Sequence, residues 1–194
     1  MITWKQIERQ WQAGDYGKLL GELTVGRPEA SPRMQTSLGR ALPAAAMAVI
    51  RMDELSQNYL PICAKMTRTV LASQEIDGGW GDPMTTALCV RALLVGNGHG
   101  LAIERGMQYL ANLQKEEGIW PRIPIRRMEA DAYTSAFILF HLGDVEIFRN
   151  MVQFDAAVGW FKQHEQELDA DTRKLWQRAQ LKCQGARQRA FVWS

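Results

Sequence analysis

Two similar heptapeptides indicate the architecture of this chain: QEIDGGW, from Gln74 to Trp80, and QKEEGIW, from Gln114 to Trp120. Each copy has a glutamine at its first position, a glycine at its fifth and a tryptophan at its last, and the first residues of the two copies are 40 positions apart (114 minus 74). Similarity at a fixed period of about 20 to 50 residues is typical of proteins built from stacked repeats. The pair therefore predicts a repeat architecture.

The segments around both copies have a helical hydrophobic period. Before each copy, residues 60–74 and 101–114 carry apolar side chains every three or four positions, as in a helix that buries one stripe. After each copy, residues 83–95 and 131–142 are apolar around most of the circumference, which predicts enclosed helices. A further enclosed helix is predicted over 41–52. The alternation of outer and inner helices predicts a stack of helical hairpins.

Shorter helices are expected at both ends of the chain, over 4–12, 16–23, 155–168 and 171–184, with a loop over 25–34. No segment shows the two-residue alternation typical of a strand. A length of 194 residues suits one domain of ordinary size. We therefore expect one helical-repeat domain over 1–194, in which 1–35 and 150–194 form atypical terminal helices that cap the stack.

Composition argues against several classes of protein. Apolar residues make up 46% and charged residues 23%, as in soluble globular proteins. A formal net charge of +2 gives no electrostatic reason to expect nucleic acid as a partner. The sequence shows neither a secretory signal nor the run of about 20 apolar residues that spans a bilayer, so we expect a cytoplasmic protein without a transmembrane segment.

The three cysteines, Cys63, Cys89 and Cys183, lie far apart in predicted helices. Their number is odd, and their spacing fits neither a disulfide framework nor a zinc site. We therefore expect buried free thiols, and the sequence predicts neither a metal nor a cofactor.

The second copy with its preceding helix reads RGMQYLANLQKEEGIW, and it closely resembles the QW repeat of squalene-hopene and oxidosqualene cyclases. The first copy keeps the Gln, Gly and Trp of that repeat but has Met66 and Thr69 at its small and aromatic positions. The resemblance covers about residues 40–145. It implies an α/α toroid like that of terpene cyclases and of the β subunits of protein prenyltransferases, with inner helices around a central cavity.

The residues of the motif also have a structural interpretation. A glutamine at a helix end can bond free carbonyl groups, a glycine allows a sharp exit, and a tryptophan packs its ring on the next repeat. On this interpretation six residues join the repeats and form no binding site: Gln74, Gly78, Trp80, Gln114, Gly118 and Trp120.

Class II terpene cyclases protonate their substrate with the central acid of a DxDD motif. The nearest match here is EADAYTSA, in which Glu129 and Asp131 occupy two of the acidic positions and Ala132 replaces the last acid. These two carboxylates are the candidate catalytic acids, and the alternative for Asp131 is to cap the helix that follows. The zinc-binding set of the prenyltransferases is not matched, because Asp82 and Cys89 are seven residues apart. The sequence favours a protein that is not an enzyme.

The segment PRIPIRRMEAD, which follows the second copy, is longer than the loop after Trp80 and carries three arginines between apolar residues: Arg122, Arg126 and Arg127. Guanidinium groups suit phosphate and carboxylate, so the loop could bind a diphosphate, a phospholipid head group or an acidic partner. An ordinary solvated loop is the alternative. Further candidates for ligand binding lie on the predicted inner helices: Arg91, Tyr133 and His141. For His141 the alternative is a histidine of the core or of a cavity wall.

Chain length limits the number of repeats. A closed toroid needs about five to seven hairpins, more than this chain supplies at about 40 residues each. We therefore expect an incomplete, open arc of about three to four hairpins, whose exposed apolar surface would mark an interaction site. The leading hypothesis is a non-catalytic, terpene-cyclase-like protein that binds a partner protein, a second copy of itself or an apolar ligand through its concave face. The alternative is a small isoprenoid-processing or terpenoid-processing enzyme or carrier with an apolar central pocket.

Overall fold

The computed structural model describes residues 3–23, 41–96, 99–125 and 127–192, with 185–192 described by their backbone alone. Every regular element within these ranges is an α-helix, and their only paired extended residues are Pro121 and Ala130, which form a single bridge. The predicted all-α class is confirmed. The loop predicted over 25–34 lies outside the described residues.

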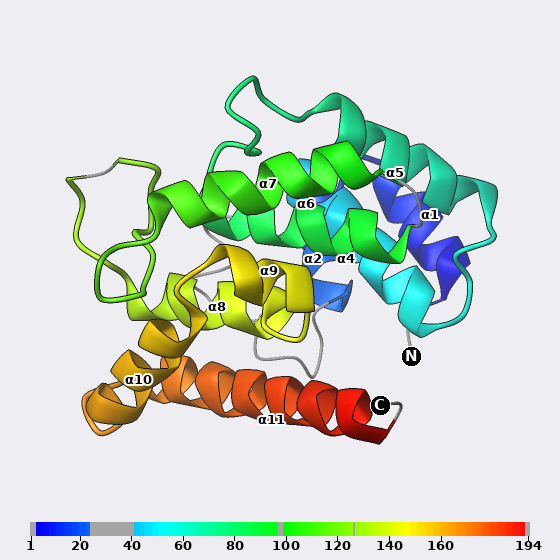
Figure 1. Ribbon diagram of the computed structural model, residues 1–194. Helices are drawn as coiled ribbons and strands as arrows, with labels where there is room; N and C mark the ends of the chain where they lie inside the picture. The colour runs from blue at the N-terminus through cyan, green and yellow to red at the C-terminus, as the bar shows by residue number, and fades with distance from the viewer. Residues whose placement is uncertain (1–2, 24–40, 97–98, 126, 193–194) are drawn as a thin grey trace. The chain divides into compact units, whose positions relative to one another are not determined.

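The chain divides into two compact units, whose helices are labelled in Figure 1. The first unit comprises Met1–Ile76 and Leu88–Glu104, and the second comprises Asp77–Ala87 and Arg105–Ser194. Helices α6 (Pro83–Val95) and α7 (Gly100–Leu113) each contribute residues to both units.

The first unit contains helices α1 (Trp4–Gln12), α2 (Tyr16–Leu23), α4 (Ala41–Glu54) and α5 (Pro61–Ala72). Helix α4 packs against both α2 and α5, and α1 packs against α2. Pro43 lies in the first turn of α4, where the backbone N–H groups have no partner within the helix, so the helix is not broken there.

The burial of α4 and α5 follows their apolar patterns. Helix α4 is buried without interruption from Pro43 to Ile50, as expected of an enclosed helix. Helix α5 instead buries one stripe, which includes Cys63, Met66 and Val70. The same contrast separates α6, which is buried throughout 83–90, from the amphipathic α7.

The second unit contains helices α8 (Ala132–Leu142), α9 (Glu146–Met151), α10 (Phe154–His164) and α11 (Ala170–Val192). Helix α8 is buried at every position from Tyr133 to Leu142, and it packs along α11. Helix α9 was not expected from the sequence, and α11 continues past the predicted end at residue 184.

Candidate functional site

The two motif glutamines bind backbone groups, some of them 28 and 39 residues away in the sequence. The Gln74 side chain donates a hydrogen bond to the carbonyl oxygen of Ala102 in α7, at 2.9 Å. The Gln114 side chain donates to the carbonyl oxygens of Gly118, at 2.7 Å, and Gln153, at 3.3 Å. Its own oxygen accepts from the Gln153 backbone N–H at 2.7 Å. Each amide therefore ties a helix end to a later segment of the chain.

The motif glycines occupy positions that exclude a side chain. Gly78 and Gly118 have φ angles of +94° and +85°, in the left-handed region that other residues rarely adopt. A Cβ atom on Gly78 would lie 2.7 Å from the Arg105 carbonyl oxygen. A Cβ atom on Gly118 would lie 2.7 Å from the Ala156 carbonyl carbon and would collide with the Ala157 nitrogen. Both glycines are therefore needed for close approach of two backbone segments.

The motif tryptophans are buried and anchor the start of the helix that follows each copy. The Trp80 backbone N–H donates to the Thr86 hydroxyl at 3.0 Å, and the Trp120 backbone N–H donates to the Ser135 hydroxyl at 2.8 Å. The indole N–H of Trp120 donates to the Leu110 carbonyl oxygen, also at 2.8 Å. These contacts give the motif a structural function.

Asp131 is the N-cap residue of α8. Its Oδ1 accepts a hydrogen bond from the Thr134 backbone N–H at 2.7 Å, so it satisfies one of the unpaired donors at the helix start. Asp82 makes the same contact before α6, where its Oδ1 accepts from the Thr85 backbone N–H at 2.9 Å. Glu129 is exposed, without the enclosed surroundings that a general acid of the cyclase kind uses. These contacts favour capping over catalysis for Asp131.

The segment 121–130, here called the arginine loop, is anchored at its base. Pro121 pairs with Ala130, and the Asp131 backbone N–H donates to the Trp120 carbonyl oxygen at 2.8 Å. Within the loop, the Met128 backbone N–H donates to the Ile125 carbonyl oxygen at 2.9 Å. The bridge and the hydrogen bond to Trp120 hold the two ends of the loop together at the start of α8.

The arginine loop combines cationic and apolar side chains at the surface. Arg122 and Arg127 are exposed, whereas Arg126 lies outside the described residues. Three apolar side chains are exposed beside them: Ile123 at 39%, Ile125 at 51% and Met128 at 44%. The sequence showed the alternation of arginine and apolar residues, but it did not show that the apolar side chains face solvent.

The ligand-binding candidates on the inner helices belong to different units. Arg91 is half-buried and belongs to the first unit, whereas Tyr133 and His141 belong to the second unit. Tyr133 and His141 are almost completely buried. The His141 ring packs against Phe137, with ring centroids 4.5 Å apart, and against Phe140, at 5.0 Å. These contacts are those of a core histidine.

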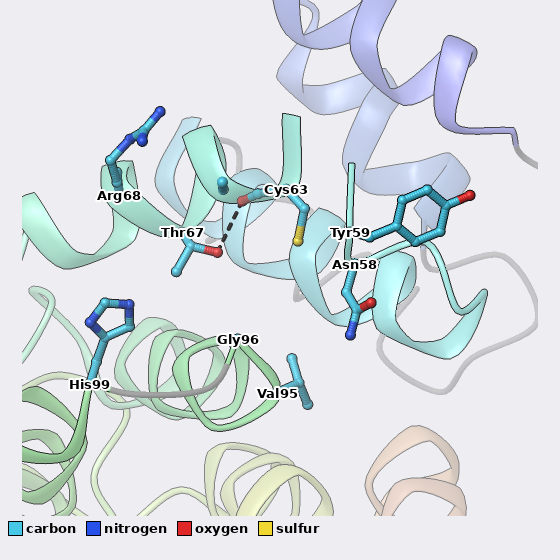
Figure 2. A pocket seen from close by; sticks show the side chains of 9 residues that line it. Asn58, Tyr59, Cys63, Thr67, Arg68, Val95, Gly96 and His99 are labelled. Carbon is cyan, nitrogen blue, oxygen red and sulfur yellow. Dashed lines mark hydrogen bonds between the residues drawn. The ribbon is translucent and has the colours of Figure 1, made fainter. Parts of the chain in front are cut away.

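A hollow of about 400 Å³ in the first unit was not foreseen from the sequence. Figure 2 shows Cys63, Thr67 and Arg68 of α5 on one side of it and His99 on another. The Arg68 side chain points away from His99, so the guanidinium group and the imidazole ring do not converge. Because residues from several segments line the hollow, no sequence motif marks it.

Cys63 is the buried nucleophile of this hollow. Burial raises the pKa of the Cys63 thiol, the charge of Asp53 raises it further, and the Thr67 hydroxyl lowers it. The pKa of the Cys63 thiol is raised overall, and this reduces the fraction of reactive thiolate. The hollow therefore has no activated cysteine.

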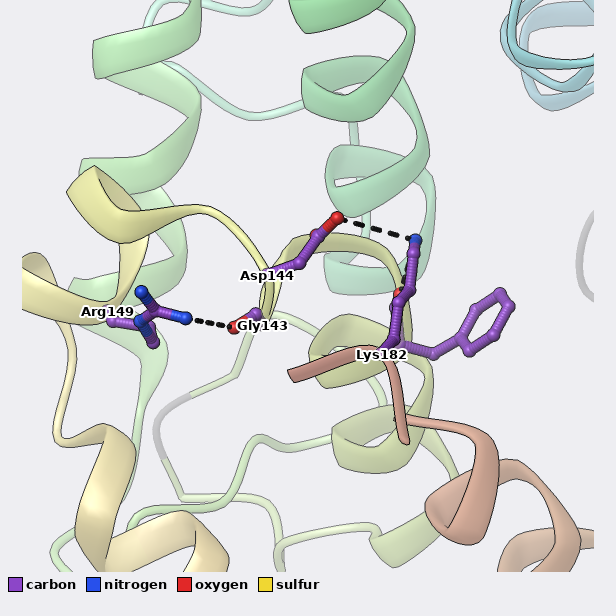
Figure 3. A network of polar contacts seen from close by, with 5 residues as sticks. Gly143, Asp144, Arg149 and Lys182 are labelled. Carbon is purple, nitrogen blue, oxygen red and sulfur yellow. Dashed lines mark hydrogen bonds and ion pairs between the residues drawn. The ribbon is translucent and has the colours of Figure 1, made fainter. Parts of the chain in front are cut away.

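A polar cluster in the second unit connects α11 to the end of α8 (Figure 3). The Lys182 ammonium donates to the Phe140 carbonyl oxygen at 3.0 Å and lies 4.0 Å from a carboxylate oxygen of Asp144. Arg149 donates to the Gly143 carbonyl oxygen at 3.2 Å. Cations near a helix C-terminus satisfy its last carbonyls. This cluster therefore has a structural function.

Among the residues that the structure describes, no three His, Cys, Asp or Glu side chains are grouped so that they could hold a metal ion. None of the described helices combines the length and apolarity needed to cross a membrane. No protein-family model, curated protein or solved structure matches the chain.

Proposed function

We propose that this chain is a non-catalytic helical-repeat protein that binds a partner protein through its arginine loop. The observation that carries the proposal is the exposure of Ile123, Ile125 and Met128 on a loop with an anchored base. An anchored base limits the conformational freedom that the loop loses on binding, so burial of its apolar side chains favours association. The resemblance to QW repeats supports the further proposal that the hairpins form an open, toroid-like arc.

The charges of the loop specify the chemistry of the partner. Arg122 and Arg127 are exposed beside the three apolar side chains. Arginine and methionine are enriched in protein interfaces, and arginine pairs well with carboxylates. The matching surface has an apolar centre and acidic residues at its rim. We propose that the partner is a different protein with such a surface and not a second copy of this chain.

The contacts of the acidic candidates favour this function over isoprenoid chemistry. A cyclase needs a protonated carboxylic acid that can donate its proton to the substrate. Asp131 instead accepts a hydrogen bond from the Thr134 backbone N–H at the start of α8, and Glu129 is exposed on the arginine loop. The isoprenoid hypothesis therefore lacks a suitable acid among these two residues.

The test uses one loop variant and one matched control. The loop variant replaces Ile123, Ile125 and Met128 with serine, and the control replaces three exposed apolar residues elsewhere with serine: Ile76, Leu101 and Ile147. Wild type and both variants are immobilised, and extracts of the cells that produce the protein are passed over them. Proteins retained by wild type and by the control, but not by the loop variant, are purified and titrated directly.

We expect the loop variant to weaken binding of a purified partner by about tenfold or more, since one interface hot spot contributes about 1 to 2 kcal/mol or more. Replacing Arg122 and Arg127 with glutamate should slow association, and the effect should diminish at high salt. Equal binding by wild type and the loop variant would refute the proposal. Light scattering that shows a loop-dependent dimer, or binding only to anionic vesicles, would also refute it.

A further inference from the structure

The methionines of this chain differ in their exposure to solvent. Of the nine in the sequence, Met1 and Met34 lie outside the described residues. Met151 is half-buried, and Met128 is 44% exposed. The others are at most 5% exposed: Met47, Met52, Met66, Met84 and Met107. Met128 is therefore the most exposed methionine in the described part of the chain.

Met128 supplies part of the apolar surface of the arginine loop. Its backbone N–H donates to the Ile125 carbonyl oxygen at 2.9 Å, so these two residues lie in one turn. Ile123 and Ile125 also expose apolar side chains, at 39% and 51%. The residues on either side of Met128, Arg127 and Glu129, are exposed as well. Small polar molecules in the solvent therefore have access to this part of the loop.

A thioether that meets solvent is open to oxidation by hydrogen peroxide. The sulfur attacks one peroxide oxygen and the O–O bond breaks; that oxygen becomes the sulfoxide oxygen, and the other leaves as water after proton transfer. The sulfur loses two electrons, and the peroxide gains them. The product is polar, whereas the thioether is apolar. Methionine sulfoxide reductases reverse the step, as two thiols become a disulfide and the oxygen leaves as water.

We propose that Met128 is a site of reversible oxidation by hydrogen peroxide, and that its sulfoxide removes apolar character from the surface of the arginine loop. The buried methionines are protected, because the oxidant does not reach their sulfur atoms while the protein is folded. One consequence rests on the proposed function: oxidation of Met128 weakens partner binding by the loop. The modification itself needs no partner.

The first measurement follows the oxidation of folded protein by hydrogen peroxide over time. Trypsin cleavage after lysine and arginine places every methionine of the chain in a peptide of its own, and Met128 in the peptide 128–149. Mass spectrometry then records which peptides gain one oxygen. We expect peptide 128–149 to be oxidised before the peptides of the buried methionines, and this difference to disappear in urea. Equal rates in the folded protein would overturn the proposal.

The second measurement is retention on a phenyl resin, which reports exposed apolar surface. Wild type treated with peroxide should elute earlier than untreated protein, and methionine sulfoxide reductases A and B with dithiothreitol should restore its retention. Met128→Leu keeps an apolar side chain that forms no sulfoxide, so peroxide should leave its retention unchanged. Because this variant keeps all three cysteines, it also controls for their oxidation. Met151→Leu is the matched control and should respond to peroxide as wild type does.

The outcomes separate this proposal from the proposed function. A loss of retention in wild type and Met151→Leu, but not in Met128→Leu, would support it. Unchanged retention of wild type, an equal loss in Met128→Leu, or no recovery with the reductases would overturn it. Both measurements are made without a partner, so these failures leave the proposed function untouched. Equal partner binding by wild type and the loop variant would refute the proposed function and leave the oxidation of Met128 unaffected.

Discussion

Replacing Gly118 with alanine should destabilise the protein, because two costs coincide at this position. The φ angle of +85° is unfavourable for any residue with a Cβ atom, by about 1 to 2 kcal/mol. The new methyl group would also collide with the backbone of Ala156 and Ala157 in α10. Overpacking of this kind costs about 1 to 3 kcal/mol.

Together these costs amount to about 2 to 5 kcal/mol. Alanine also restricts the unfolded chain, which returns about 0.5 kcal/mol, so a net loss of about 1.5 to 4.5 kcal/mol remains. With a urea dependence of about 2 kcal/mol per molar, the unfolding midpoint should fall by about 0.7 to 2.3 M. Far-UV circular dichroism and tryptophan fluorescence measure this midpoint.

Gly159 supplies the matched control. It lies inside α10, the helix that approaches Gly118, and a Cβ atom there would meet nothing within 4 Å. Gly159→Ala should therefore raise stability by about 0.5 to 1 kcal/mol, the difference in helix propensity. A Gly118→Ala midpoint equal to or above that of wild type would refute the proposed close packing at the joint.

Two further predictions concern Asp131 and Cys63. Asn caps a helix about as well as Asp, so Asp131→Asn should keep the wild-type free energy of unfolding in urea, whereas Asp131→Ala should lose about 1 kcal/mol. If wild type formed a product from squalene or a prenyl diphosphate and Asp131→Asn did not, a purely structural function of Asp131 would be contradicted. Because the pKa of the Cys63 thiol is raised in the folded state, its contribution to stability is full at neutral pH and is lost as the pH rises through the folded pKa. Alkylation of Cys63, followed by mass spectrometry, should accordingly need a higher pH in folded than in urea-unfolded protein, and equal pH profiles would contradict the raised pKa.

The helices that the sequence predicts well are those whose pattern reflects their surroundings. The bounds of α1 and α2 agree with the prediction, and α8 is buried on all sides, as its nearly continuous apolar sequence indicates. Helix α9 was missed because its six residues are too few to show a hydrophobic period. Helix α11 extends further than predicted because a polar helix has no apolar period to mark its end.

The candidate sites were only partly predictable for a related reason. The arginines of the loop are visible in the sequence, but the exposure of Ile125 depends on tertiary contacts such as the pairing of Pro121 with Ala130. The hollow beside Cys63 is lined by residues of several segments, so none of these segments alone indicates it. Capping by Asp131 is a local interaction, and for that reason its position before an apolar helix suggests it.

Hydrogen exchange of the Trp120 indole N–H provides the decisive measurement for the structural function of the paired motif. This N–H donates to the Leu110 carbonyl oxygen at 2.8 Å, and the side chain is completely buried. We expect it to exchange only when the surrounding structure unfolds, with a protection free energy close to the free energy of unfolding in urea. Exchange as fast as that of a solvent-exposed indole would contradict a structural joint at Trp120.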